Sequence, residues 1–92
     1  SSKIQIKYWR DHNGPEVDWV VENSGEYIPV EVKWTKTPSS HDVKNLGIFL
    51  KEYPNASRGY LVCQTPKRIK LGDQIIGLPW GEIEEVLSKH AQ

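Results

Sequence analysis

The chain has 92 residues, 37% hydrophobic and 10% aromatic, which suits one domain with one core and leaves no room for a second domain. Its 12 lysine and arginine residues balance 12 aspartate and glutamate residues, so net charge provides no general attraction to nucleic acid or to an acidic membrane. The single cysteine excludes an internal disulfide, and no stretch reaches the ~18 consecutive apolar residues of a membrane helix. We therefore expect a soluble, cytoplasmic protein without membrane contact.

The first half of the chain predicts three consecutive antiparallel strands. Residues 4–8 alternate apolar and polar side chains, and Asn13-Gly14 predicts a hairpin turn after them. Residues 16–22 and 27–34 are two further β-rich runs, joined by a short polar segment.

The second half predicts helices and a parallel strand. Ser39 or Ser40 can cap the N-terminus of a helix whose apolar positions follow a 3.6-residue period as far as Tyr53. We expect residues 60–63 to form a buried strand, parallel to its neighbour because a helix crosses over before it. A weaker strand and a short helix complete the prediction: residues 74–76 and about residues 80–89. The sequence thus predicts an α/β fold with a mixed sheet and flanking helices.

The second hairpin collects four charged side chains on one face. With a two-residue turn, Asp18 lies opposite Glu31, and Glu16 lies opposite Lys33. The other face then carries apolar side chains that suit a helix-covered core: Val17, Trp19, Val21, Ile28, Val30 and Val32.

Two carboxylates that face each other across strands repel, because their Cβ atoms lie only about 5 Å apart. Mg²⁺ or Mn²⁺ removes that cost, since such an ion takes one or two protein carboxylates and grips substrate phosphate oxygens. We therefore expect Asp18 and Glu31 to bind the metal, with the Val32 backbone carbonyl as a further ligand. Lys33 would orient the attacking water and stabilise charge on the phosphate. Glu16 would tune Lys33 or bind a second ion.

Two other interpretations of these residues stay open. The charged side chains are equally consistent with a solvated strand face, where each cross-strand salt bridge contributes at most about 1 kcal/mol. A three-residue loop at residues 23–25 with a bulge would shift the register and move Glu31 to the face opposite Asp18.

The string Glu16-Val-Asp18, twelve intervening residues and Glu31-Val-Lys33, placed on strands before a helix and a strand, resembles the PD-(D/E)xK nuclease superfamily over about residues 4–64. The resemblance implies a restriction-endonuclease-like fold and a Mg²⁺-dependent endonuclease that hydrolyses phosphodiester bonds in DNA. It assigns metal binding to Asp18 and Glu31 and assistance to the water nucleophile to Lys33.

Four further segments are similar to the C-terminal domain of a family of prokaryotic AAA-type ATPases: Tyr8-Trp9-Arg10, Gly14-Pro-Glu-Val-Asp18, Ile28-Pro-Val-Glu-Val-Lys33 and Leu78-Pro79-Trp80. This implies that residues 1–92 are one nuclease-like domain that follows an ATPase module, and the absence of methionine agrees with a fragment of a longer chain. Active superfamily members often add an acid from a helix before the first strand. The alternative is therefore a non-catalytic binding or oligomerisation module that keeps the nuclease fold and self-associates.

Other polar and aromatic residues give weaker signals. Lys36, His41 and Lys44 are candidate phosphate contacts near the start of the expected helix, although such residues are more typical of a solvated surface. We expect the tryptophans to pack in the core or at sheet edges rather than to stack on bases. The three histidines are too far apart in sequence for a zinc site.

Overall fold

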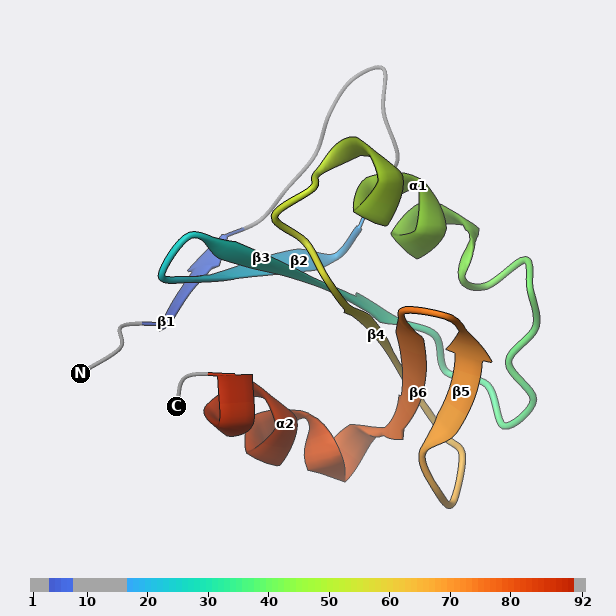
Figure 1. Cartoon of the computed structure of the whole chain (residues 1–92). Helices are drawn as coiled ribbons and strands as arrows, with labels where there is room; N and C mark the ends of the chain where they lie inside the picture. The colour runs from blue at the N-terminus through green and yellow to red at the C-terminus, as the bar shows by residue number, and fades with distance from the viewer. Residues whose placement is uncertain (1–3, 8–16, 91–92) are drawn as a thin grey trace.

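The computed structural model describes residues 4–7 and 17–90. These residues form a six-stranded mixed sheet with one α-helix packed on each face (Figure 1). In chain order the elements are β1 (Ile4–Lys7), β2 (Trp19–Asn23), β3 (Glu26–Val32), α1 (Lys44–Glu52), β4 (Gly59–Cys63), β5 (Ile69–Gly72), β6 (Ile75–Pro79), the 3₁₀ helix η1 (Trp80–Glu82) and α2 (Ile83–His90).

The sheet has the order β1-β2-β3-β4-β6-β5. Strands β1, β2 and β3 are antiparallel, whereas β4 is parallel to both β3 and β6. Helix α1 makes the crossover between β3 and β4, and β5 closes the far edge antiparallel to β6. The expected α/β fold, with antiparallel hairpins followed by a helix and a parallel strand, is therefore confirmed.

The turn between β2 and β3 determines which side chains share a face. Ser24 and Gly25 have φ values of 50° and 84°, as a two-residue type I′ turn requires. The pairs run from Trp19↔Val30 to Asn23↔Glu26, which is the predicted two-residue register. The alternative three-residue loop with a bulge is therefore wrong.

Strand β2 begins at Trp19, later than expected, because at Asp18 the side chain rather than the backbone forms the next hydrogen bond to β3. One oxygen of its carboxylate, Oδ2, accepts a 2.7 Å hydrogen bond from the Val32 N–H. The chain bends here, and Val17 packs with Val20 under α1. The expectation that Val17 shares a face with Trp19 and Val21 is therefore wrong. Glu16 and the expected Asn13-Gly14 turn lie outside the described residues.

Each face of the sheet supports its own apolar cluster. On the α1 face, Leu46 and Phe49 of the helix pack with Leu61 of β4. On the α2 face, Val86 packs with apolar side chains from β2, β3, β4 and β6: Val21, Ile28, Val30, Tyr60, Val62 and Leu78. Because helices cover both faces, the charged end of the hairpin lies under α1 rather than on an open sheet surface.

Helix α1 begins at Lys44, and the residue before it is Val43 rather than the predicted cap Ser39 or Ser40. Ser39 instead closes a turn with Asp42, whose Oδ2 accepts hydrogen bonds from the Ser39 N–H at 2.9 Å and from its hydroxyl at 3.2 Å. Val43, the residue before the helix, makes no side-chain capping bond. The serine signal therefore marks the turn that leads into the helix and not its first residue.

Strand β5 is absent from the sequence prediction. It forms through pairing with β6, where Ile69 lies opposite Gly77. A Cβ on Gly77 would lie 2.8 Å from Cγ2 of Ile69 and 2.9 Å from Cδ1 of Leu71. Only glycine permits this close packing, a tertiary requirement that strand propensity does not reveal.

Burial and helix length bear on two further features. Cys63 is buried at the end of β4, as expected for a core residue. In the part of the chain that the structure describes, no helix is long and apolar enough to cross a membrane.

Candidate functional site

The structure brings Asp18, Glu31 and Lys33 together at one end of the β2–β3 hairpin. Asp18 precedes β2, Glu31 belongs to β3, and Lys33 follows it with its N–H bonded to the Val62 carbonyl at 2.9 Å. The charges of Asp18 and Lys33 both shift the pKa of Glu31, as does a hydrogen bond from Asn45 of α1. The charges of the three predicted residues therefore lie close enough together to interact, beside α1.

Asp18 is held in place by the backbone. Its 2.7 Å bond from the Val32 N–H orients the carboxylate at the end of the strand ladder. The predicted Val32 ligand is the carbonyl of the same residue, and that role stays a prediction. Because a hydrogen-bonded carboxylate loses little further freedom when it binds a cation, this arrangement prepares Asp18 to act as a ligand.

Glu31 is the electrostatically unusual residue of the site. Its side chain is almost covered, with 8% of the residue exposed, and Oε2 has no hydrogen-bond partner among the described residues. Burial, and after it the nearby charge of Asp18, raise the pKa of Glu31 to about 7 against the opposing effects of Lys33 and Asn45. Glu31 is thus not part of a solvated strand face, and that interpretation is wrong for this residue.

Asp42 adds negative charge from the turn before α1. Its pKa is lowered, chiefly by the hydrogen bond from the Ser39 N–H, so it is ionised at neutral pH. Its charge also raises the pKa of Glu31. The local balance is therefore acidic, with Lys33 as the cation that shifts the pKa of both Glu31 and Asp42.

The carboxylate pair fits the requirements of a hard divalent cation. Mg²⁺ commonly takes one or two protein carboxylates and keeps several waters, so a pair is sufficient. The unpartnered Oε2 of Glu31 and its repulsion by Asp18 are both relieved by a cation between them. Within residues 17–90 no cluster of three His, Cys, Asp or Glu side chains is arranged to hold a metal ion, so a third acidic ligand is not found there.

Residues 1–83 match the family model described as "Domain of unknown function (DUF4143)". The chain belongs to the DUF4143 family. The matched range contains Asp18, Glu31 and Lys33 and extends to the first residue of α2. A search of the curated proteins found no match, and a search of the solved structures found none either.

Sequence reasoning missed the role of Asn45 in this DUF4143 domain. Asn45 precedes the buried Phe49 by four residues, so the two side chains lie on the same face of a helix. A polar residue on the buried face of a helix is the signal that could have identified it. Asn45 could be placed beside Glu31 only once the first residue of α1 and the path of this helix across β3 were known.

The predicted nucleic-acid contacts of the DUF4143 domain lie on the surface. Lys36, His41 and Lys44 are all exposed, in the loop after β3 and in the first turn of α1. Lys36 also lines a hollow of about 380 Å³ at the edge where β4 and β6 end, together with Trp34 and Trp80. Both tryptophans are 64% exposed, so neither packs in the core, which is one of the two placements that the sequence predicts.

Proposed function

We propose that this domain is a metal-dependent nuclease domain of the PD-(D/E)xK type, which hydrolyses phosphodiester bonds in DNA as part of a longer chain with an AAA-type ATPase module. The observation that carries the proposal is the buried carboxylate of Glu31, with an unpartnered oxygen, beside Asp18 and Lys33. The mixed sheet with a helical crossover into a parallel strand supports a restriction-endonuclease-like fold.

Asp18 and Glu31 would hold Mg²⁺ or Mn²⁺. When bound, such an ion supplies Lewis-acid polarisation of a phosphoryl oxygen and lowers the pKa of a coordinated water. The chain itself supplies the orientation: the Val32 N–H holds Asp18, and Asn45 restrains Glu31 from α1. Lys33 is exposed and lies beside the carboxylates, where its positive charge would offset negative charge that develops on a bound phosphate.

Mn²⁺ binding at pH 7.5, measured by calorimetry, tests the metal site. We expect Asp18→Asn and Glu31→Gln to weaken binding about tenfold or more, because each removes one negative charge with little change in shape. The asparagine keeps an oxygen that can accept the Val32 N–H, so the strand end should stay intact. Glu84→Gln, on the exposed side of α2, is the matched control and should bind like the wild type.

Lys33→Ala separates metal binding from catalysis. We expect this variant to retain Mn²⁺ binding and to lose cleavage of single- and double-stranded DNA by about 100-fold or more, because one charge that stabilises the developing anion is gone. If the wild-type domain binds no Mn²⁺ at millimolar concentration, the nuclease proposal fails. If it binds the metal but cuts no DNA, the site is a metal site without the proposed activity.

A second candidate is a non-catalytic binding or oligomerisation module. It is favoured by an apolar groove of about 350 Å³ on the α2 face, lined by β2, β3, β4, α2 and three exposed tryptophans: Trp19, Trp34 and Trp80. Exposed apolar grooves of this kind are typical of surfaces that bind another protein.

A further inference from the structure

A separate hollow lies on the α2 face of the sheet, between α2 and the β5–β6 hairpin. Its volume is about 460 Å³, and its walls come from β4, β5, β6 and α2. The carboxylate pair lies on the α1 face, so the sheet separates the two sites. This hollow therefore has to be explained independently of the proposed nuclease chemistry.

Positive charge is concentrated around this hollow. In a chain whose 12 basic and 12 acidic residues balance, four basic side chains line it: Arg58, Arg68, Lys70 and Lys89. No aspartate or glutamate is among the described residues that line it. A local excess of cations in a concave surface attracts anions, whatever the net charge of the whole molecule.

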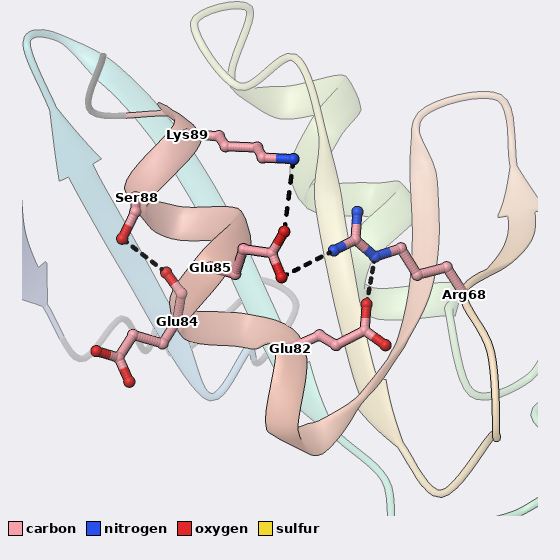
Figure 2. A network of polar contacts seen from close by, with 6 residues as sticks. All are labelled: Arg68, Glu82, Glu84, Glu85, Ser88 and Lys89. Carbon is pink, nitrogen blue, oxygen red and sulfur yellow. Dashed lines mark hydrogen bonds and ion pairs between the residues drawn. The ribbon is translucent and has the colours of Figure 1, made fainter.

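Two of these cations are held by acidic residues of η1 and α2, as Figure 2 shows. The Nε of Arg68 lies 2.5 Å from Oε1 of Glu82, and its Nη2 lies 3.8 Å from Oε2 of Glu85. Lys89 Nζ lies 3.5 Å from Oε1 of Glu85. These ion pairs position Arg68 and Lys89 on the rim while leaving further N–H groups free to donate.

The other two cations have no acidic partner in the described part of the chain. No ion pair involves Arg58 or Lys70 there. A hydrogen bond and the positive charge of Arg58 both act on the phenol of Tyr60. Together Arg58 and Lys70 provide two positive charges that no ion pair among the described residues neutralises, which match a doubly charged anion.

The inside of the hollow combines a hydrogen-bonded pair of polar side chains with an apolar floor. The Tyr60 hydroxyl lies 2.6 Å from Nε2 of His90, and burial raises the pKa of Tyr60, so its hydroxyl stays protonated at neutral pH. The floor consists of Ile76, Leu78 and Val86. A charged rim over an apolar floor suits a ligand that has both a charged and an apolar part.

We propose that this hollow binds a small phosphorylated organic molecule, with its phosphomonoester against Arg58 and Lys70 and its apolar body on the floor formed by Ile76, Leu78 and Val86. A phosphomonoester carries nearly two negative charges at neutral pH, and the arginine guanidinium matches its oxygens with paired N–H donors. The volume falls within the range of about 300–1,000 Å³ that is usual for small-molecule sites.

Calorimetry with phenyl phosphate, inorganic phosphate and benzyl alcohol tests the two parts of this site. We expect phenyl phosphate to bind at least about tenfold more tightly than inorganic phosphate, and benzyl alcohol not to bind measurably. Arg58→Gln and Lys70→Gln should each weaken phenyl phosphate binding about tenfold or more. Both side chains are exposed, so neither change removes core packing. Lys51→Gln, an exposed lysine of α1 on the other side of the sheet, is the control and should have no effect.

Several outcomes would overturn the proposal. These are the absence of phenyl phosphate binding at millimolar concentration, binding that survives both substitutions, and an equal loss in Lys51→Gln. Competition by a single-stranded oligonucleotide, lost in Arg58→Gln, would assign the hollow to nucleic-acid phosphates instead of a small molecule. Asp18→Asn should leave phenyl phosphate binding unchanged, so the outcome here is independent of the proposed nuclease site.

Discussion

Glu31 shows how one residue can oppose the stability of the fold that contains it. Its carboxylate is covered by α1, lacks a partner for Oε2 in the described chain and lies near the negative charge of Asp18. Removing a carboxylate from water costs free energy unless a partner compensates for the loss. Such a cost is common where a residue serves binding or catalysis rather than packing.

This residue makes stability depend on pH. The folded pKa of about 7 exceeds the ordinary 4.5, so Glu31 favours the folded state fully below about pH 4.5 and loses that contribution as pH rises through 7. In a chelator, we expect the free energy of unfolding of the wild type to fall by about 1–3 kcal/mol from pH 4.5 to pH 8, relative to Glu31→Gln. Urea unfolding of both proteins measures the difference, and parallel pH profiles would contradict the assignment.

At the scale of elements, the β2–β3 turn and strand β3 both meet local requirements of the backbone. Both central residues of the β2–β3 turn have positive φ, which glycine adopts freely and serine does not. Pro29 lies in β3 just before the parallel pairing with β4 begins at Val30↔Tyr60. Its missing N–H therefore costs no hydrogen bond in that ladder.

Two glycine-to-alanine changes test the turn against a helix. Gly25→Ala should lower the free energy of unfolding by about 1 kcal/mol, because φ is 84° although no atom lies within 4 Å of the added Cβ. Gly47→Ala also meets open space but lies in α1, so it should raise stability by about 0.5–1 kcal/mol. Thermal or urea unfolding measures both changes. If both substitutions changed the free energy of unfolding equally and in the same direction, backbone conformation would not be what determines their effects.

At the scale of the whole molecule, α2 divides its face of the sheet into two different surfaces. Ile83 and Leu87 line the apolar groove on the β2–β3 side, whereas Val86 and Lys89 line the basic hollow on the β5–β6 side. The side chain of Asn23 donates a 2.6 Å hydrogen bond to the His90 carbonyl, which attaches the end of α2 to β2. The position of this helix therefore determines both surfaces.

The groove predicts concentration-dependent self-association if the domain is an oligomerisation module. We expect the double substitution Trp34→Gln and Trp80→Gln to weaken self-association about tenfold or more in sedimentation equilibrium. The free energy of unfolding should change by less than about 1 kcal/mol, because both side chains are 64% exposed. Ile48→Gln, an exposed apolar residue of α1, is the control. A wild-type domain that stays monomeric at high concentration would argue against this second function.

Much of the hairpin could be predicted from the sequence because strand geometry is local. A two-residue turn fixes the register of the hairpin, and the observed pairs from Trp19↔Val30 to Asn23↔Glu26 agree with it. The apolar run at residues 60–63 likewise predicts a buried parallel strand, because a helical segment precedes it.

What surrounds those residues was decided only by the tertiary structure. The burial of Glu31, its proximity to Asn45 and the pairing of β5 depend on where α1 and β6 pack, which no short sequence window specifies. The basic hollow likewise joins Arg58 to Lys89 across strands and a helix. Short-range pattern determined which side chains share a face, whereas long-range packing determined which of them are removed from water and which charges lie together.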